Sequence, residues 1–185
     1  MSFKIYSSAD RKTINWAGGT STEIFVYPSD GDFATRNFTF RISTATVEVE
    51  ESTFTFFEGI TRHLMILQGE LELNHTDRYT KQLNVYDQDT FSGEWPTTAK
   101  GKVTDFNLML KNGAEGSLKH IELDEGKRTI ITKRSDYCFA YIAYGLCTID
   151  GTSLFAGDLV QIEQGEAKLI ALEDCDLIEI SVKLS

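Results

Sequence analysis

Polar side chains on two strand-like segments are the residues best suited to hold a small molecule. Arg41 stands between Phe40 and Ile42, so in a strand it points to the opposite face from both of them. Asp105 and Asn107 are two positions apart and would share one strand face. On a pocket wall Asn107 can orient a ligand amide or carboxylate, and Asp105 can hold an arginine. The alternatives are a structural ion pair for Arg41 and a solvated face for the other two.

A second candidate region is the short segment Trp16–Thr20, which carries two adjacent glycines. Such a pair is typical of a tight turn, because glycine permits positive φ and a close backbone approach. The indole of Trp16 can wall a pocket, with Thr20 beside it. The segment lacks the lysine and the spacing of a phosphate-binding loop. Glu23 follows, and its carboxylate is suited either to acid–base chemistry or to pairing with an arginine.

Histidine and cysteine, which commonly serve as bases, nucleophiles or metal ligands, are sparse, with three of each. No Ser-His-Asp or Cys-His order is legible in the chain. The cysteines form no CxxC pair and have no histidine at ligand spacing, so we expect reduced, packed thiols. The residues concerned are Cys138, Cys147 and Cys175, with His63, His75 and His120 scattered elsewhere.

The elements that must position these residues are β-strands. Apolar and polar residues alternate with a period of two in Phe38–Ser43, Gly69–Leu73 and Leu177–Val182. Asp150–Gly151 predicts a tight hairpin, because both residues tolerate positive φ. No amphipathic helix longer than three turns is evident, so we predict an all-β fold of many short strands. Its core is expected to include Phe38, Phe40, Phe54, Phe56, Phe57 and Phe106.

The chain also repeats itself. Residues 64–73 form a strand–glycine–strand pattern around Gly69, and residues 140–149 repeat it around Gly145. The two glycines are 76 positions apart (145 − 69), and a similar turn-containing segment follows each. A duplicated β-unit is the simplest explanation. We expect residues 1–110 to form one half and residues 111–185 the other, joined in a single compact unit.

The composition of the chain argues against nucleic acids and membranes as binding partners. The 185 residues carry a net charge of −10 without any Lys/Arg cluster, which argues against a nucleic-acid partner. The longest apolar runs are far too short to span a membrane. The N-terminal residues contain no long apolar segment, so we expect no secretory signal and a cytoplasmic protein.

The strand–glycine–strand pattern, followed by a Gly-Asp strand and a turn, resembles the cupin superfamily of small β-barrels, and its repetition resembles a bicupin. Four segments in order resemble the HutD/Ves family: Trp16–Ile24, Phe40–Ala45, Phe54–Arg62 and Asp105–Met109. One departure is Glu58, where that family usually has proline. The C-terminal half resembles only a degenerate cupin barrel. The resemblance implies an all-β bicupin with two cupin-like β-barrel or jelly-roll halves. It also implies a metal-free protein with a regulatory or ligand-binding role, associated with histidine-utilisation genes.

The resemblance also bears on metal binding. Metal-binding cupins carry two histidines and a glutamate in their first motif, with the glutamate seven residues before the glycine that Gly69 resembles. That position holds Arg62 here, and Pro96 stands where the second motif has histidine. Transition-metal sites need several converging donors. We therefore expect no metal and no other cofactor.

Arg62 becomes the sharpest candidate through this resemblance, which implies that its side chain points into the barrel. A planar guanidinium there can clamp a ligand carboxylate bidentately. The alternative is a structural ion pair with Glu23, Glu58 or Asp105.

Three functions follow from these residues. The first is binding of a small anionic molecule, such as a formylated glutamate, around Arg62. The second is metal-independent acid–base catalysis by Glu23 or Asp105, and the third is a regulator or scaffold that binds a protein partner. The sequence favours binding, because an arginine pocket without histidine, cysteine or paired acids is suited to recognition. It leaves open whether any reaction is catalysed and whether the chain forms a homodimer.

Overall fold

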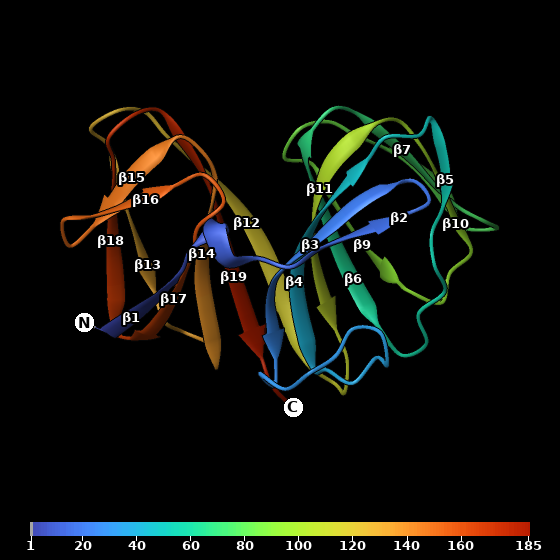
Figure 1. The fold of residues 1–185 in the computed structure, drawn as a ribbon, viewed down its shortest axis with the longest axis horizontal. Coiled ribbons are helices and arrows are strands. Elements are labelled where there is room, and N and C mark those ends of the chain that lie inside the picture. Colours follow the sequence, from blue (N-terminus) through green and yellow to red (C-terminus); the bar gives the residue numbers. More distant parts are fainter. Residues whose placement is uncertain (1) are drawn as a thin grey trace. The chain divides into compact units, whose positions relative to one another are not determined.

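The computed structural model describes residues 2–185 and consists almost wholly of antiparallel β-strands (Figure 1). In these residues the helical structure is one 3-10 turn, η1 (Ser8–Asp10). The all-β prediction is confirmed. Within the described chain, no helix has the length and apolar character needed to cross a membrane.

The chain divides into two compact units, one of residues 12–114 and the other of residues 2–11 together with 115–185. The sequence placed the boundary at residue 110 and assigned the N-terminal residues to the first half. The structure differs because the first strand, β1 (Ser2–Tyr6), pairs with β17 (Leu159–Gln164) of the other unit.

Residues 12–114 form two facing sheets. The six-stranded sheet has the order β2 (Thr13–Trp16), β3 (Gly19–Tyr27), β4 (Phe40–Val47), β11 (Val103–Leu110), β6 (Thr61–Gln68) and β9 (Gln88–Ser92). The four-stranded sheet has the order β5 (Glu51–Thr53), β10 (Thr97–Lys100), β7 (Leu71–His75) and β8 (Tyr79–Leu83). Alternate residues of both sheets point inward and pack together, among them Leu64, Ile66, Leu73 and Phe91.

The second unit repeats this plan. Its five-stranded sheet has the order β1, β17, β14 (Tyr137–Tyr144), β19 (Cys175–Lys183) and β12 (Glu115–Leu123). Its four-stranded sheet has the order β13 (Arg128–Thr132), β18 (Glu166–Ala171), β15 (Leu146–Ile149) and β16 (Thr152–Phe155). Figure 1 shows the blue β1 beside β17, whose sequence position is near the opposite end of the chain.

The predicted duplication is confirmed by the strand order. The series β4-β11-β6-β9 corresponds to β12-β19-β14-β17, and β5-β10-β7-β8 corresponds to β13-β18-β15-β16. Gly69 lies between β6 and β7 with φ +85°, and Gly145 lies between β14 and β15 with φ +81°. The units differ in what they add to this common set, because β2 and β3 extend one sheet at β4, whereas β1 extends the other at β17.

The interiors of the two units differ in polarity. Inward positions of residues 115–185 are filled by aliphatic side chains and the three cysteines, which are buried and free, as predicted. Cys138 occupies the position in β14 that matches Arg62 in β6. The predicted hairpin at Asp150–Gly151 is also confirmed, since both residues have positive φ between β15 and β16.

The predicted phenylalanine core is correct except at one position. Phe38, Phe40, Phe57 and Phe106 are buried, and Phe54 packs against the core. Phe56 is 64% exposed. Phe56 belongs to the irregular segment after β5, where strand alternation does not determine which side chains are buried.

Candidate functional site

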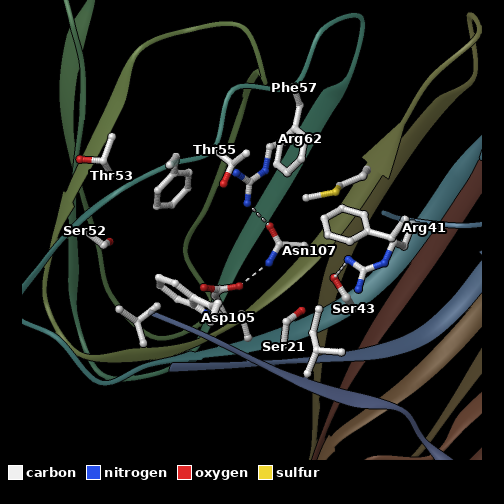
Figure 2. Close-up of a pocket in the computed structure, with 17 residues that line it drawn as sticks. Ser21, Arg41, Ser43, Ser52, Thr53, Thr55, Phe57, Arg62, Asp105 and Asn107 are labelled. Carbon is white, nitrogen blue, oxygen red and sulfur yellow. Dashed lines mark hydrogen bonds between the residues drawn. The ribbon is translucent and has the colours of Figure 1, made fainter. Parts of the chain in front are cut away.

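A cavity of about 220 Å³ lies inside the unit of residues 12–114. Its base is the inner face of β4, β11 and β6, and its sides are the β2–β3 hairpin and the segment that follows β5 (Figure 2). The volume suits a small metabolite, since sites for drug-sized ligands usually measure roughly 300–1,000 Å³. The lining residues are Ile14, Trp16, Ser21, Phe33, Arg41, Ser43, Ala45, Val47, Ser52, Thr53, Phe54, Thr55, Phe57, Arg62, Asp105, Asn107 and Met109.

Arg62 of β6 is the most isolated charge on the cavity wall. Its side chain is buried, and Nη2 donates to Asn107 Oδ1 at 2.7 Å. Nε is buried without a hydrogen-bond partner. The structural ion pair considered from the sequence, with Glu23, Glu58 or Asp105, is not formed among the described residues, where no carboxylate lies within 4 Å of the guanidinium.

Three aromatic rings surround the Arg62 guanidinium instead. Its central carbon lies 4.7 Å from the ring centre of Phe54, 5.3 Å from that of Phe91 and 5.8 Å from that of Phe57. Such cation–π contacts contribute roughly 0.5–2 kcal/mol each. Burial lowers the pKa of Arg62 to about 10, although nearby Asp105 acts in the opposite direction. Arg62 therefore stays charged at neutral pH.

Asn107 connects Arg62 to Asp105, as Figure 2 shows. As predicted, both β11 side chains share the face that lines the cavity, opposite Phe106 and Leu108. Asn107 accepts from Arg62 through Oδ1 and donates to Asp105 through Nδ2. Burial raises the pKa of Asp105 to about 7, against the lowering effects of Arg62 and Asn107. A cation, an amide and a carboxyl group thus form one chain along the base of the cavity.

Arg41 of β4 is held by an acidic partner. Nε donates to Glu23 Oε2 at 2.8 Å, and Nη1 donates to Ser43 Oγ at 2.8 Å. Its guanidinium carbon lies 4.1 Å from the ring centre of Phe33. The structural ion pair considered for Arg41 is therefore present, and the residue lines the cavity as well.

The remaining candidate site residues from the sequence lie on the β2–β3 hairpin. Trp16 lines the cavity next to the predicted tight turn and is 40% exposed. Thr20 does not line it, whereas its neighbour Ser21 does, because adjacent strand residues point to opposite faces. Glu23 lines an adjoining cavity of about 210 Å³ that shares Arg41 with the first.

Some of the lining residues carry no signal in the sequence. Phe33 comes from the loop between β3 and β4, and Ser52–Thr55 and Phe57 come from β5 and the irregular segment after it. No periodicity marks such segments. Met109 could have been found, because it continues the alternation of Asp105 and Asn107 along β11.

A second buried polar cluster contains a histidine that the sequence showed only as scattered. His75 Nδ1 lies 2.8 Å from Thr97 Oγ1, and His75 Nε2 lies 3.0 Å from Asp89 Oδ2. Tyr79 and Lys81 also donate to Asp89. The order of groups is that of a nucleophile, a base and an acid, but Thr97 is only 1% exposed. The cluster therefore ties β7, β9 and β10 together and offers no hydroxyl to a substrate.

Possible metal ligands do not converge in residues 2–185. No three His, Cys, Asp or Glu side chains there gather closely enough to hold an ion. The absence of a bound metal in the protein stays a prediction, to be checked by elemental analysis.

Comparison with family models assigns the chain to a protein family. The model described as HutD matches residues 8–178. The chain belongs to the HutD family. This confirms the resemblance carried by the four N-terminal segments, and the HutD match extends it across most of the C-terminal unit. No curated protein matches the chain significantly.

Solved structures show the fold of this HutD-family chain. HutD from Pseudomonas fluorescens SBW25 has a TM-score of 0.75 at 20% identity, covering 98% of this chain and 100% of that one. The conserved protein of unknown function PA5104 from Pseudomonas aeruginosa PAO1 has a TM-score of 0.81 at 21% identity, covering 99% and 100%. YhhW from Escherichia coli has a TM-score of 0.74 at 11% identity, covering 97% of each chain. The predicted bicupin fold is confirmed.

Proposed function

We propose that this HutD-family protein binds a small carboxylate metabolite in the cavity of residues 12–114, with Arg62 as the carboxylate clamp. The unsatisfied Arg62 guanidinium supports this role. Nε is buried without a partner, and Nη1 makes no hydrogen bond within residues 2–185. A guanidinium binds a carboxylate through two parallel N–H···O bonds, either from Nε and Nη2 or from Nη1 and Nη2. Nη2 has a second N–H besides the one that bonds Asn107, so one of these two pairs remains available to a ligand.

The charge balance of the cavity favours an anionic ligand. Glu23 already compensates Arg41. Arg62 has only Asp105 nearby, beyond ion-pair distance and with a pKa of about 7. A buried, unpaired charge costs several kcal/mol even after relaxation. A ligand carboxylate placed against Arg62 offsets part of that cost, and this is the source of the expected affinity.

Within this class we propose an intermediate of histidine catabolism, such as a formylated glutamate, bound in a regulatory or ligand-binding role. The HutD family name points to histidine utilisation. The P. fluorescens HutD structure was determined in a formate condition, and formate is the smallest carboxylate. The apolar walls formed by Val47, Phe54 and Met109 suit the methylene groups of a longer acid.

The test is the binding of N-formyl-L-glutamate, L-glutamate and formate to wild-type protein and to two Arg62 variants, measured by calorimetry at pH 7. We expect Arg62→Met to abolish binding, because the charge is removed. We expect Arg62→Lys to weaken it by at least tenfold, since lysine keeps the charge without the planar fork. Both variants should remain folded, because Arg62 forms no direct ion pair with a protein carboxylate, and Asp105 can take up a proton when the cation is removed.

The matched control is Arg128→Met, which removes an exposed arginine from β13 in the other unit. It should bind like wild type. Wild-type affinity in Arg62→Met, or equal binding of an uncharged amide analogue, would contradict the proposal.

A further inference from the structure

Asp105 is the second buried charge-bearing group on the wall of this cavity. It is 4% exposed, and its side chain accepts one side-chain hydrogen bond, from Asn107 Nδ2. In residues 2–185 no lysine or arginine nitrogen approaches its oxygens within 4 Å. Its charge is therefore compensated at a distance, across the Asn107 amide, by Arg62.

The neighbouring elements supply few other charges. Across β11, Asp105 faces Ala45 of β4 and Ile66 of β6. The titratable groups of these strands that line the cavity are Arg62 on β6 and Arg41 on β4, and Arg41 is paired with Glu23 of β3. The cavity-lining residues of β2 and of the segment from Ser52 to Phe57 are apolar, aromatic or hydroxyl-bearing. Arg62 is thus the cation on which the ionised form of Asp105 depends.

A ligand carboxylate on Arg62 changes this balance. One buried cation then faces two carboxylates, and like charges in a shared site raise the pKa of one of them. Burial, opposed by Arg62 and Asn107, leaves the pKa of Asp105 at about 7 in the ligand-free protein, so a further increase keeps it protonated above neutral pH. The ligand carboxylate contacts the guanidinium directly, whereas Asp105 is separated from it by the Asn107 amide. Asp105 is therefore the carboxyl group that takes the proton.

We infer that the cavity binds its anion together with one proton, which Asp105 takes from solvent as the ligand carboxylate occupies Arg62. This rests on the proposed function and assigns Asp105 a role in tuning affinity. The protonated carboxyl is a hydrogen-bond donor, so the occupied site also presents an O–H group at the base of the cavity. Ligand affinity is then highest below the pKa of free Asp105 and falls above it.

The experiment is calorimetric titration of N-formyl-L-glutamate at pH 8 in two cationic buffers with different heats of ionisation. We expect net proton uptake on ligand binding by wild-type protein. From pH 7 to pH 9 the Kd should rise, by at most tenfold per pH unit, which is the limit for linkage to a single proton. Asp105→Asn should show neither effect, because it carries no proton to exchange. Glu58→Gln, which removes an exposed carboxylate, should behave like wild type.

The outcomes distinguish proton uptake by Asp105 from carboxylate binding at Arg62. Binding without proton uptake, or an unchanged pH dependence in Asp105→Asn, overturns the inference and leaves the proposed function intact. Absence of wild-type binding at every pH overturns both. A ligand-free readout is carbon-13 NMR of the side-chain carboxyls. Arg62→Met should raise the pKa of Asp105 above its wild-type value, and an unchanged pKa also overturns the inference.

Discussion

Arg41 and Arg62 illustrate two ways of burying a guanidinium. Arg41 is neutralised by Glu23 and bonded to Ser43. Arg62 has one amide oxygen and three aromatic rings. Rings attract the cation through their quadrupoles, but they do not replace the hydrogen bonds that its N–H groups make in water. The second arrangement keeps the charge in place and leaves its donors available to an anion.

Asp105 should make the stability of the ligand-free protein depend on pH. Its pKa is 3.8 in a model peptide and about 7 in the folded protein. Because the folded state holds the proton more tightly, this contribution to stability is complete below about pH 4 and is lost as pH rises towards 7. Asp105→Asn lacks this dependence, so we expect its free energy of unfolding to rise by about 2–3 kcal/mol relative to that of wild type between pH 5 and pH 8.

Denaturant unfolding of both proteins at the two pH values measures this difference. Arg62 does not interfere, because its pKa of about 10 lies above the range. Equal stability differences at pH 5 and pH 8 would show that Asp105 is ionised throughout, contrary to the raised pKa.

The sequence was informative about residues on regular strands. Alternation placed Arg41 on the opposite face from Phe40 and Ile42, and Asp105 on the same face as Asn107, while the resemblance to cupins implied that Arg62 points into the barrel. It could not choose between a ligand and a protein acid as the partner of each arginine, since that depends on side-chain distances across strands. Thr20 was expected beside Trp16, but its neighbour Ser21 lines the cavity. A predicted turn does not show which of the residues after it points inward.

Gly69 and Gly145 lie at equivalent bends in the two units, and a backbone carbonyl group packs closely against each of them. A Cβ at Gly69 would lie 2.4 Å from the Lys102 carbonyl oxygen, and one at Gly145 would lie 2.2 Å from that of Asp174. The repeat found in the sequence thus reflects the same steric requirement twice. The pairing of β1 with β17 had no comparable local signal, because nothing near residues 2–6 specifies a partner more than 150 positions away.

Gly69→Ala should therefore destabilise the protein much more than Gly59→Ala. Both glycines have positive φ, but a Cβ at Gly59 would meet no atom within 4 Å. Gly59→Ala should cost about 1–2 kcal/mol for the left-handed backbone alone. Gly69→Ala adds displacement of the Lys102 backbone, and we expect a total of roughly 3–5 kcal/mol. Thermal and denaturant unfolding would compare them, and equal losses would mean that the β6–β7 bend relaxes freely.

For the molecule as a whole, deletion of residues 2–11 should affect the C-terminal strands. β1 covers the edge of β17 along Ser2–Tyr6, and Phe3 and Ile5 pack against the apolar interior of residues 115–185. We expect hydrogen exchange to rise first and most in β17, where backbone groups lose their partners. Unchanged exchange in β17 would show that β1 contributes little. The expectation that both units unfold together stays a prediction.

Because β1 pairs with β17, its pairing must come late in the synthesis of the chain. The β1 residues leave the ribosome long before their partners, because Leu159–Gln164 are made only after about 150 further residues, a delay of roughly 10–30 seconds. In that interval the complete sequence of residues 12–114 becomes available, and its own strands pair without β1. A nascent chain of this protein therefore carries the β1 segment unpaired throughout the assembly of residues 12–114. Residues 2–6 are among the last to reach their final place.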